Sequence, residues 1–137
     1  MITLNKDWKA GKEFSILILR LVAGFVLLYG HGFGKLSTIF TGQEINFFDP
    51  IGIGANLSFY LAAFAEGICA ILLMLGLFTR YAAIVLAINF LVIFRVHFKD
   101  GYEALELISL YLFTYIAIVF AGGGKYSLDN LLFNKTR

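Results

Sequence analysis

Charged residues are scarce in this sequence. Only 15% of its 137 residues are Asp, Glu, Lys or Arg, whereas soluble domains carry about 25%. Hydrophobic residues make up 60% of the chain, and its mean hydropathy is +0.84. This composition excludes an ordinary soluble domain, and the length predicts one integral membrane domain covering residues 1–137.

Cysteine and basic residues are also too few for several kinds of site. One cysteine, Cys69, excludes an internal disulfide, a CxxC redox pair and a thiolate metal cage. The net charge is only +2, and no basic stripe interleaves with aromatics, so we predict no nucleic-acid partner. The stretch "GHGFGKLS" fails as a phosphate loop, because Leu36 follows Lys35 where Ser or Thr is required.

Long apolar segments are present instead. A membrane-crossing helix needs about 20 mainly apolar residues, and four segments qualify: 14–33, 57–78, 81–98 and 104–121. Each must satisfy its own backbone hydrogen bonds in lipid, which requires helices. The sequence therefore predicts an all-α, antiparallel four-helix bundle in a lipid bilayer. No small-residue cleavage site follows the first segment, so we expect a retained anchor and no signal peptide.

Lys and Arg residues are unequally divided between the two sides of such a bundle. The side with both termini holds Lys6, Lys9, Lys12, Arg80, Lys125, Lys135 and Arg137. By the positive-inside rule, both termini are expected in the cytoplasm. The opposite side carries a long segment between the first two helices, residues 35–56, which is either a semi-ordered surface loop or a cap on the bundle.

Ionisable residues inside membrane spans are rare and are functional-site candidates by default. Arg20 and His31 lie in the first span, Glu66 in the second and Asn89, a polar neutral residue, in the third. Glu66 is flanked by small residues, which let a neighbouring helix or a ligand approach. We predict that Asn89, at the same depth, hydrogen-bonds Glu66 and that Arg20 is its counter-charge.

Three further polar residues, Lys35, His97 and Glu106, are expected near the outer ends of the spans and form a second tier of candidates. No HExxH or paired-histidine spacing is present, so we predict no metal site. The buried cluster has two main interpretations. It is a structural ion pair that fixes helix register, or it lines a cavity that holds a quinone-like head group or relays protons. A path across the membrane is a third possibility.

Several motifs together resemble the DoxX family of bacterial four-helix membrane proteins. They are "ILRLVAGFVLLYGHGFGKL" in the first span, "AEGICAILLMLGLFTRYAAI" from the second span into the third, and "GGGKYSLDNLL" after the fourth. The resemblance places the family's first-helix arginine on Arg20 and its second-helix glutamate on Glu66. The family's histidine and lysine at the end of the first helix fall on His31 and Lys35. It also implies a location in the bacterial inner membrane.

Members of that family include the membrane subunit of a thiosulfate:quinone oxidoreductase. The resemblance thus favours a small membrane subunit of a redox system, with quinone as its cofactor and a redox partner protein or a second copy as its partner. No covalent cofactor motif is present, and catalysis by this chain alone is left open. The alternative is a non-catalytic anchor or assembly subunit. A solute carrier ranks third, because no inverted repeat or interrupted helix is visible.

Overall fold

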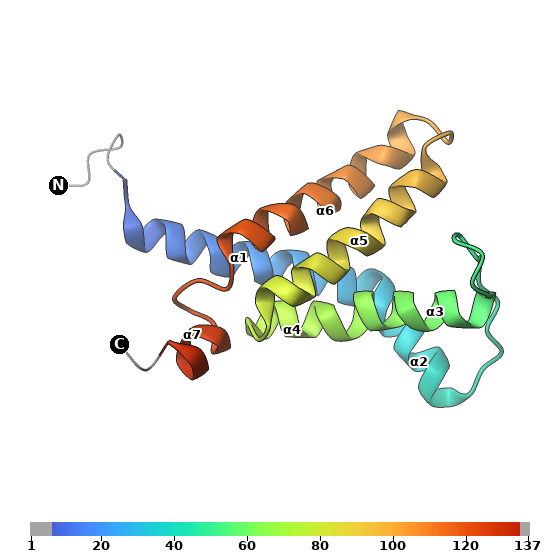
Figure 1. Cartoon of the computed structure of the whole chain (residues 1–137), viewed down its shortest axis with the longest axis horizontal. Coiled ribbons are helices and arrows are strands. Elements are labelled where there is room, and N and C mark those ends of the chain that lie inside the picture. The colour runs from blue at the N-terminus through green and yellow to red at the C-terminus, as the bar shows by residue number, and fades with distance from the viewer. Residues whose placement is uncertain (1–6, 135–137) are drawn as a thin grey trace.

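The computed structural model describes residues 7–134. Within that range four apolar helices are long enough to cross a membrane, and they run antiparallel in sequence order (Figure 1). The all-α four-helix prediction is confirmed. The bounds are α1 Lys9–Leu27, η1 Leu28–Gly32, α2 Phe33–Thr41, α3 Ala55–Ala63, η2 Phe64–Cys69, α4 Ala70–Leu75, α5 Thr79–His97, α6 Tyr102–Ala121 and α7 Leu128–Phe133.

The first two helical rods each contain a π-helical segment. The first rod runs without interruption over Lys9–Thr41 and the second over Ala55–Leu75; η1 and η2 are their respective π turns. A π turn is wider than an α turn and is frequently found at functional sites. In this protein η1 and η2 pack against each other.

The first helix is longer than predicted. It extends past the expected end at residue 33 to Thr41, and Gly42, with φ of 65°, ends it in the left-handed conformation. No glycine-induced turn or proline interrupts Phe33–Thr41, so the backbone continues as a helix. The segment between the first two spans is therefore residues 42–54 and not 35–56, and Lys35 lies on a helix. The first span also begins five residues earlier than predicted, at Lys9, and the ends of the other three spans differ from the prediction by no more than three residues.

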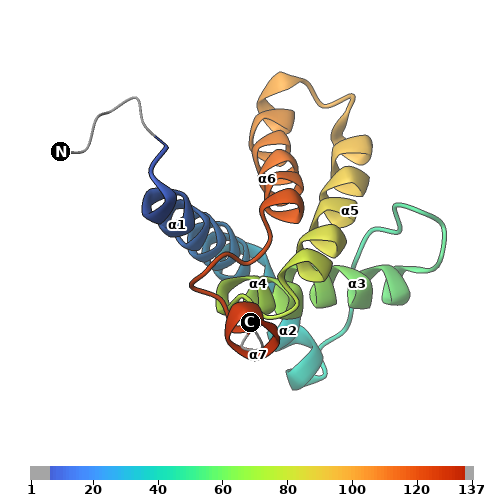
Figure 2. The same ribbon diagram turned by 60° about the vertical axis from the view of Figure 1, so that its left-hand side comes forward.

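Figure 1 shows the start of α1, the α4–α5 turn and α7 at one end of the molecule, here called the α7 end. The 42–54 loop and the α5–α6 turn lie at the opposite end, the loop end. Figure 2 shows that α5 and α6 form a pair that stands away from the rod of α3 and α4 toward the loop end. The α5–α6 pair packs along its length.

A buried apolar core joins the helices toward the α7 end. Leu27, Leu73, Leu86 and Ile118, one residue from each rod, have no exposed surface. The hydroxyl of Tyr115, also fully buried, donates to the Ala23 carbonyl at 3.1 Å. These contacts close the bundle at this level, and the cavity described below lies on the loop side of them.

The C-terminal segment is fastened to the α7 end. Both Asp129 carboxylate oxygens accept from the start of α5, from the Phe78 and Thr79 N–H groups at 2.6 and 2.8 Å. The Asp129 N–H donates to the Gly76 carbonyl at 2.8 Å. Asp129 thus satisfies free amides at a helix N-terminus, where negative charge is also favourable. The segment after the fourth span, which contains α7, is thus pinned across the end of the bundle.

Candidate functional site

A large apolar cavity opens between the rods at the loop end. Its volume is about 820 Å³, which lies within the usual range for small-molecule and cofactor sites. Most of its wall is aliphatic or aromatic, from α3, α5, α6 and the 42–54 loop. The few polar or titratable side chains on the wall are His31, Lys35, Ser58, Glu66, Asn89, His97, Glu103 and Tyr111.

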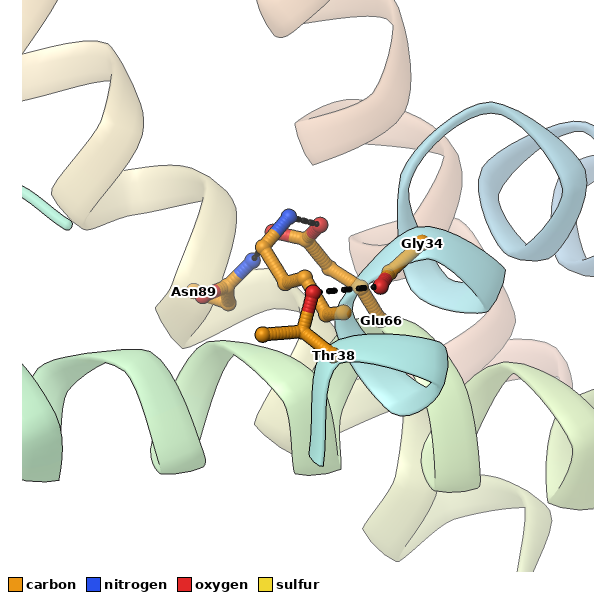
Figure 3. A network of polar contacts seen from close by, with 5 residues as sticks. Gly34, Thr38, Glu66 and Asn89 are labelled. Carbon is orange, nitrogen blue, oxygen red and sulfur yellow. Dashed lines mark hydrogen bonds and ion pairs between the residues drawn. The ribbon is translucent and has the colours of Figure 1, made fainter. Parts of the chain in front are cut away.

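Glu66 is the centre of a polar cluster on one wall of this cavity. Its Oε2 accepts from the Lys35 ammonium at 2.5 Å, and its Oε1 accepts from the Asn89 amide at 3.0 Å. Figure 3 shows Asn89 and Glu66 facing each other across the gap between α5 and η2. The side chain of Glu66 is 6% exposed and that of Lys35 is 17% exposed. The predicted Glu66–Asn89 hydrogen bond is confirmed.

The counter-charge of Glu66 is Lys35, and the prediction that Arg20 has this role is wrong. Arg20 is fully buried closer to the α7 end. Its guanidinium donates to the backbone carbonyls of Leu73, Met74 and Tyr126 at 3.1, 3.3 and 2.7 Å. Arg20 therefore satisfies carbonyls at the end of α4 and ties them to the C-terminal tail.

Gly76 explains why Arg20 can reach these carbonyls. It ends α4 with φ of 69°, and a Cβ at this position would overlap the Arg20 guanidinium. A residue without a side chain is thus required both by the left-handed backbone and by the arginine.

The two π turns bring Lys35 and Glu66 together. Gly32, the last residue of η1, lies so close to η2 that a Cβ would overlap the carbonyl oxygen of Glu66. On the other side of the crossing, a Cβ on Gly67 would overlap the side chain of Leu36. Small residues at both positions allow the backbones to touch. As a result, Lys35, one turn beyond Gly32, reaches the carboxylate.

In a regular α-helix eleven residues make three turns plus about 20°, so Arg20 and His31 would share one face. The structure does not bring them together, because η1 interrupts the regular turn between them. His31 lines the cavity, where no hydrogen bond joins it to Glu66 among the described residues. Beyond η1 the helix is continuous, and the Thr38 hydroxyl donates to the Gly34 carbonyl at 3.1 Å around Lys35 (Figure 3).

The second-tier candidates separate into two groups. Lys35 belongs to the cluster and His97 lines the cavity near its loop end. Glu106 does neither; it is exposed on α6 and lines a shallow surface hollow together with Glu103, Leu107, Ser109 and Phe113. Glu106 is therefore not part of this candidate site.

Three polar residues of the cavity wall, Ser58, Glu103 and Tyr111, were not among the predicted candidates. Tyr111 and Glu103, both on α6, line the cavity opposite α5. Their spacing of eight residues places them on one face of a helix, and this periodicity is the signal that identifies them.

The 42–54 loop forms part of the cavity wall, in agreement with the capping interpretation. Phe47, Phe48, Pro50 and Ile51 line the cavity, and the rings of Phe47 and Phe59 meet edge to face with centroids 5.4 Å apart. This contact anchors the loop on α3.

Asp49 holds the end of this loop in shape. Its carboxylate accepts from the Gly52, Ile53 and Gly54 N–H groups at 2.8–3.1 Å. It also accepts from the Ser58 hydroxyl at 2.8 Å. The bonds from Gly54 and Ser58 are the main cause that lowers the pKa of Asp49.

The site combines an anion, a cation and an amide in an apolar cavity. A lysine ammonium has three donor hydrogens, so Lys35 retains donors beyond the bond to Glu66. Among residues 7–134, no group of three or more His, Cys, Asp and Glu side chains is arranged to hold a metal ion. The chemistry that this wall offers is hydrogen bonding and proton exchange with a mainly apolar ligand.

The fold and the cavity define a multi-pass membrane protein with a polar cluster inside its helical bundle. Family comparison agrees: the DoxX family model matches residues 15–98, more than half of the chain. The chain belongs to the DoxX family. That match includes Lys35, Glu66 and Asn89, and ends before Glu103.

Two relatives match nearly the whole chain. A Bacillus subtilis (strain 168) protein named "Putative oxidoreductase CatD" is 30% identical over 134 residues, which covers 95% of this chain and 92% of that protein. An uncharacterized protein of Haemophilus influenzae (strain ATCC 51907 / DSM 11121 / KW20 / Rd) is 29% identical over 132 residues, covering 90% and 95%. No solved structure matches the chain.

Proposed function

We propose that this protein is a membrane subunit of a redox system and binds a quinone head group at the Lys35–Glu66–Asn89 cluster. The observation that carries the proposal is one polar cluster on the wall of an otherwise apolar cavity of about 820 Å³. A quinone needs hydrogen-bond donors for its carbonyl oxygens, a protonatable group nearby and an apolar cleft for its tail. The name of the Bacillus subtilis relative supports the redox class.

The residues present fit such a group. Lys35 donates toward a ring oxygen with its remaining hydrogens, and Asn89 and Glu66 fix the position of its ammonium. Phe47, Phe48 and Tyr111 offer aromatic surfaces along the cavity. When bound, a quinone would supply a carrier for electrons and protons, and the electrons would pass to or from a partner protein or a second copy of the chain.

The location and the orientation of the protein in the membrane are part of the same proposal. The described α7 end carries Lys9, Lys12, Arg80 and Lys125, whereas Lys99 is the lysine of the α5–α6 turn. Lys6, Lys135 and Arg137, which the sequence also assigned to the terminal side, lie outside the described residues. The positive-inside rule favours a bacterial cytoplasmic membrane with both termini in the cytoplasm.

A second candidate function is a non-catalytic anchor or assembly subunit. The contacts of Arg20 favour it, because this fully buried cation makes only structural bonds to carbonyls of α4 and the tail. In that case the Lys35–Glu66 pair, like Arg20, would serve to fix helix packing alone.

Binding of decylubiquinone to the full-length protein in lipid nanodiscs distinguishes the two functions. We expect saturable one-to-one binding that weakens at least tenfold in Glu66→Gln and Lys35→Met. Glu106→Gln, a change to a carboxylate outside the cavity, is the matched control and should bind as the unaltered protein does. Equal affinity in all four proteins would refute the quinone site and leave the anchor function.

A further inference from the structure

Polar side chains face the cavity at two levels on both α5 and α6. On α5 they are Asn89 and His97, and on α6 they are Tyr111 and Glu103. Each pair is eight residues apart, or about 12 Å along a helix. The rings of Phe90 and Tyr111 lie with centroids 4.9 Å apart, which sets the level of Asn89 beside that of Tyr111.

The outer level is formed where α5 ends and α6 begins. His97 is in the last turn of α5 and Glu103 is in the first turn of α6. His97 and Glu103 both line the cavity at its loop end, one from each helix of the α5–α6 pair.

His97 is already oriented to accept a proton. Its Nδ1 lies 3.0 Å from the Ile93 carbonyl oxygen, which can only accept a hydrogen bond, so Nδ1 carries the hydrogen. In the neutral ring Nε2 then holds a free lone pair. Since His97 lines the cavity, this nitrogen is a proton acceptor at the cavity mouth.

The opposite end of the bundle offers no comparable route in the described part of the chain. Between the polar cluster and the α7 end lie the fully buried Leu27, Leu73 and Leu86. Beyond them, Arg20 and the tail close the end of α4. Among residues 7–134, the open space beside Glu66 therefore leads toward the loop end.

We propose that His97 and Glu103 are a proton-transfer station through which the Lys35–Glu66 pair exchanges protons with the solution at the loop end. A proton leaving the Glu66 carboxyl passes through water in the cavity to the Nε2 lone pair of His97, which becomes an imidazolium. That proton then leaves to bulk water, aided by the Glu103 carboxylate, and the reverse sequence protonates Glu66. The inference rests on the proposed function for its purpose, because quinone chemistry exchanges protons.

The pH response of this station depends on all the charged groups that face the cavity. Glu103 faces it from α6, Glu66 from η2, and His31 and Lys35 from the first rod. The 42–54 loop contributes Phe47, Phe48, Pro50 and Ile51, none of which titrates. Arg95, on α5 itself, is exposed.

The test follows the protonation of Glu66 without any quinone. The full-length protein is reconstituted into liposomes, and protease protection of a C-terminal tag gives the fraction of molecules whose loop end faces outward. The external pH is then changed rapidly, and the carboxyl band that Glu66→Gln removes is followed by stopped-flow infrared spectroscopy. We expect the fast phase to have the amplitude of the loop-end-outward fraction.

His97→Gln and Glu103→Gln should each slow this fast phase at least tenfold, and Glu106→Gln should leave it unchanged. A fast phase that matches the opposite orientation would overturn the proposal. The same holds for unaltered rates in the His97→Gln/Glu103→Gln double variant, or for the absence of any Glu66 band change. Decylubiquinone binding is measured separately, so loss of the quinone site and loss of the proton route give different results.

Discussion

At the scale of single residues, Glu66 is the side chain on which the site depends. It accepts from Lys35 at 2.5 Å and from Asn89 at 3.0 Å, and both partners come from other rods. A buried pair of this kind adds little net stability, but removing one partner leaves an uncompensated charge. Lys35 and Glu66 should therefore be coupled energetically.

A double-mutant cycle measures this coupling. We expect Lys35→Met and Glu66→Gln each to lower the free energy of unfolding by about 3 kcal/mol, since each leaves its partner buried without an opposite charge. The double variant should lose less than the sum of the two single losses. Reversible unfolding in detergent, followed by circular dichroism, gives these values. Strictly additive losses would show that the two groups do not interact in the folded protein.

At the scale of elements, the crossing of the two π turns positions the cluster. Gly32 and Gly67 allow the backbones of η1 and η2 to touch, and Lys35 follows one turn later on α2. The site therefore depends on the closeness of two helices as much as on its polar groups. A side chain at the crossing would separate the rods and move Lys35 away from Glu66.

Gly32→Ala tests the crossing. Its Cβ would overlap the Glu66 backbone, and overpacking of this kind costs about 1–3 kcal/mol. We expect this loss of unfolding free energy together with weaker decylubiquinone binding. Gly34→Ala is the matched control, because no atom lies within 4 Å of its added Cβ. If both variants behaved alike, the close crossing would have no role in forming the site.

The 42–54 loop is a second element with a testable role. Because hydrogen bonds lower the pKa of Asp49 in the folded protein, the ionised carboxylate favours the folded state. That contribution is complete above the pKa of the unfolded chain and is lost as the pH falls through the folded pKa. The melting temperatures of the unaltered protein and Asp49→Asn should therefore converge as the pH is lowered.

Asp100→Asn is the control for this experiment. Asp100 is exposed in the α5–α6 turn, and its side chain makes no hydrogen bond among the described residues. Its variant should melt in parallel with the unaltered protein at every pH. A constant difference between Asp49→Asn and the unaltered protein would contradict the account of the loop.

At the scale of the whole molecule, hydropathy and length were enough to predict four antiparallel helices, because lipid leaves the backbone no alternative. The Glu66–Asn89 bond was also predictable, since both residues lie at one depth on helices joined by a short turn. The charged partner of Glu66, Lys35, could not be predicted in this way. Counting regular turns along the first rod missed η1 and the extension to Thr41, which together bring Lys35 to the cluster.

The role of Arg20 could not be predicted from the sequence, for a different reason. Its partners are the backbone carbonyls of Leu73, Met74 and Tyr126. Because every residue has a backbone carbonyl, no sequence pattern indicates which of them bind an arginine. Only the packing of the C-terminal segment onto the α7 end reveals why an arginine is buried there.

The measurement that tests the central claim most directly is native mass spectrometry of the protein purified gently from its own membrane. Our account predicts a stoichiometric adduct with the mass of a quinone, retained in Glu106→Gln and lost in Glu66→Gln. Lipid adducts alone on the unaltered protein, or a co-purifying protein subunit without quinone, would contradict it and favour the anchor function.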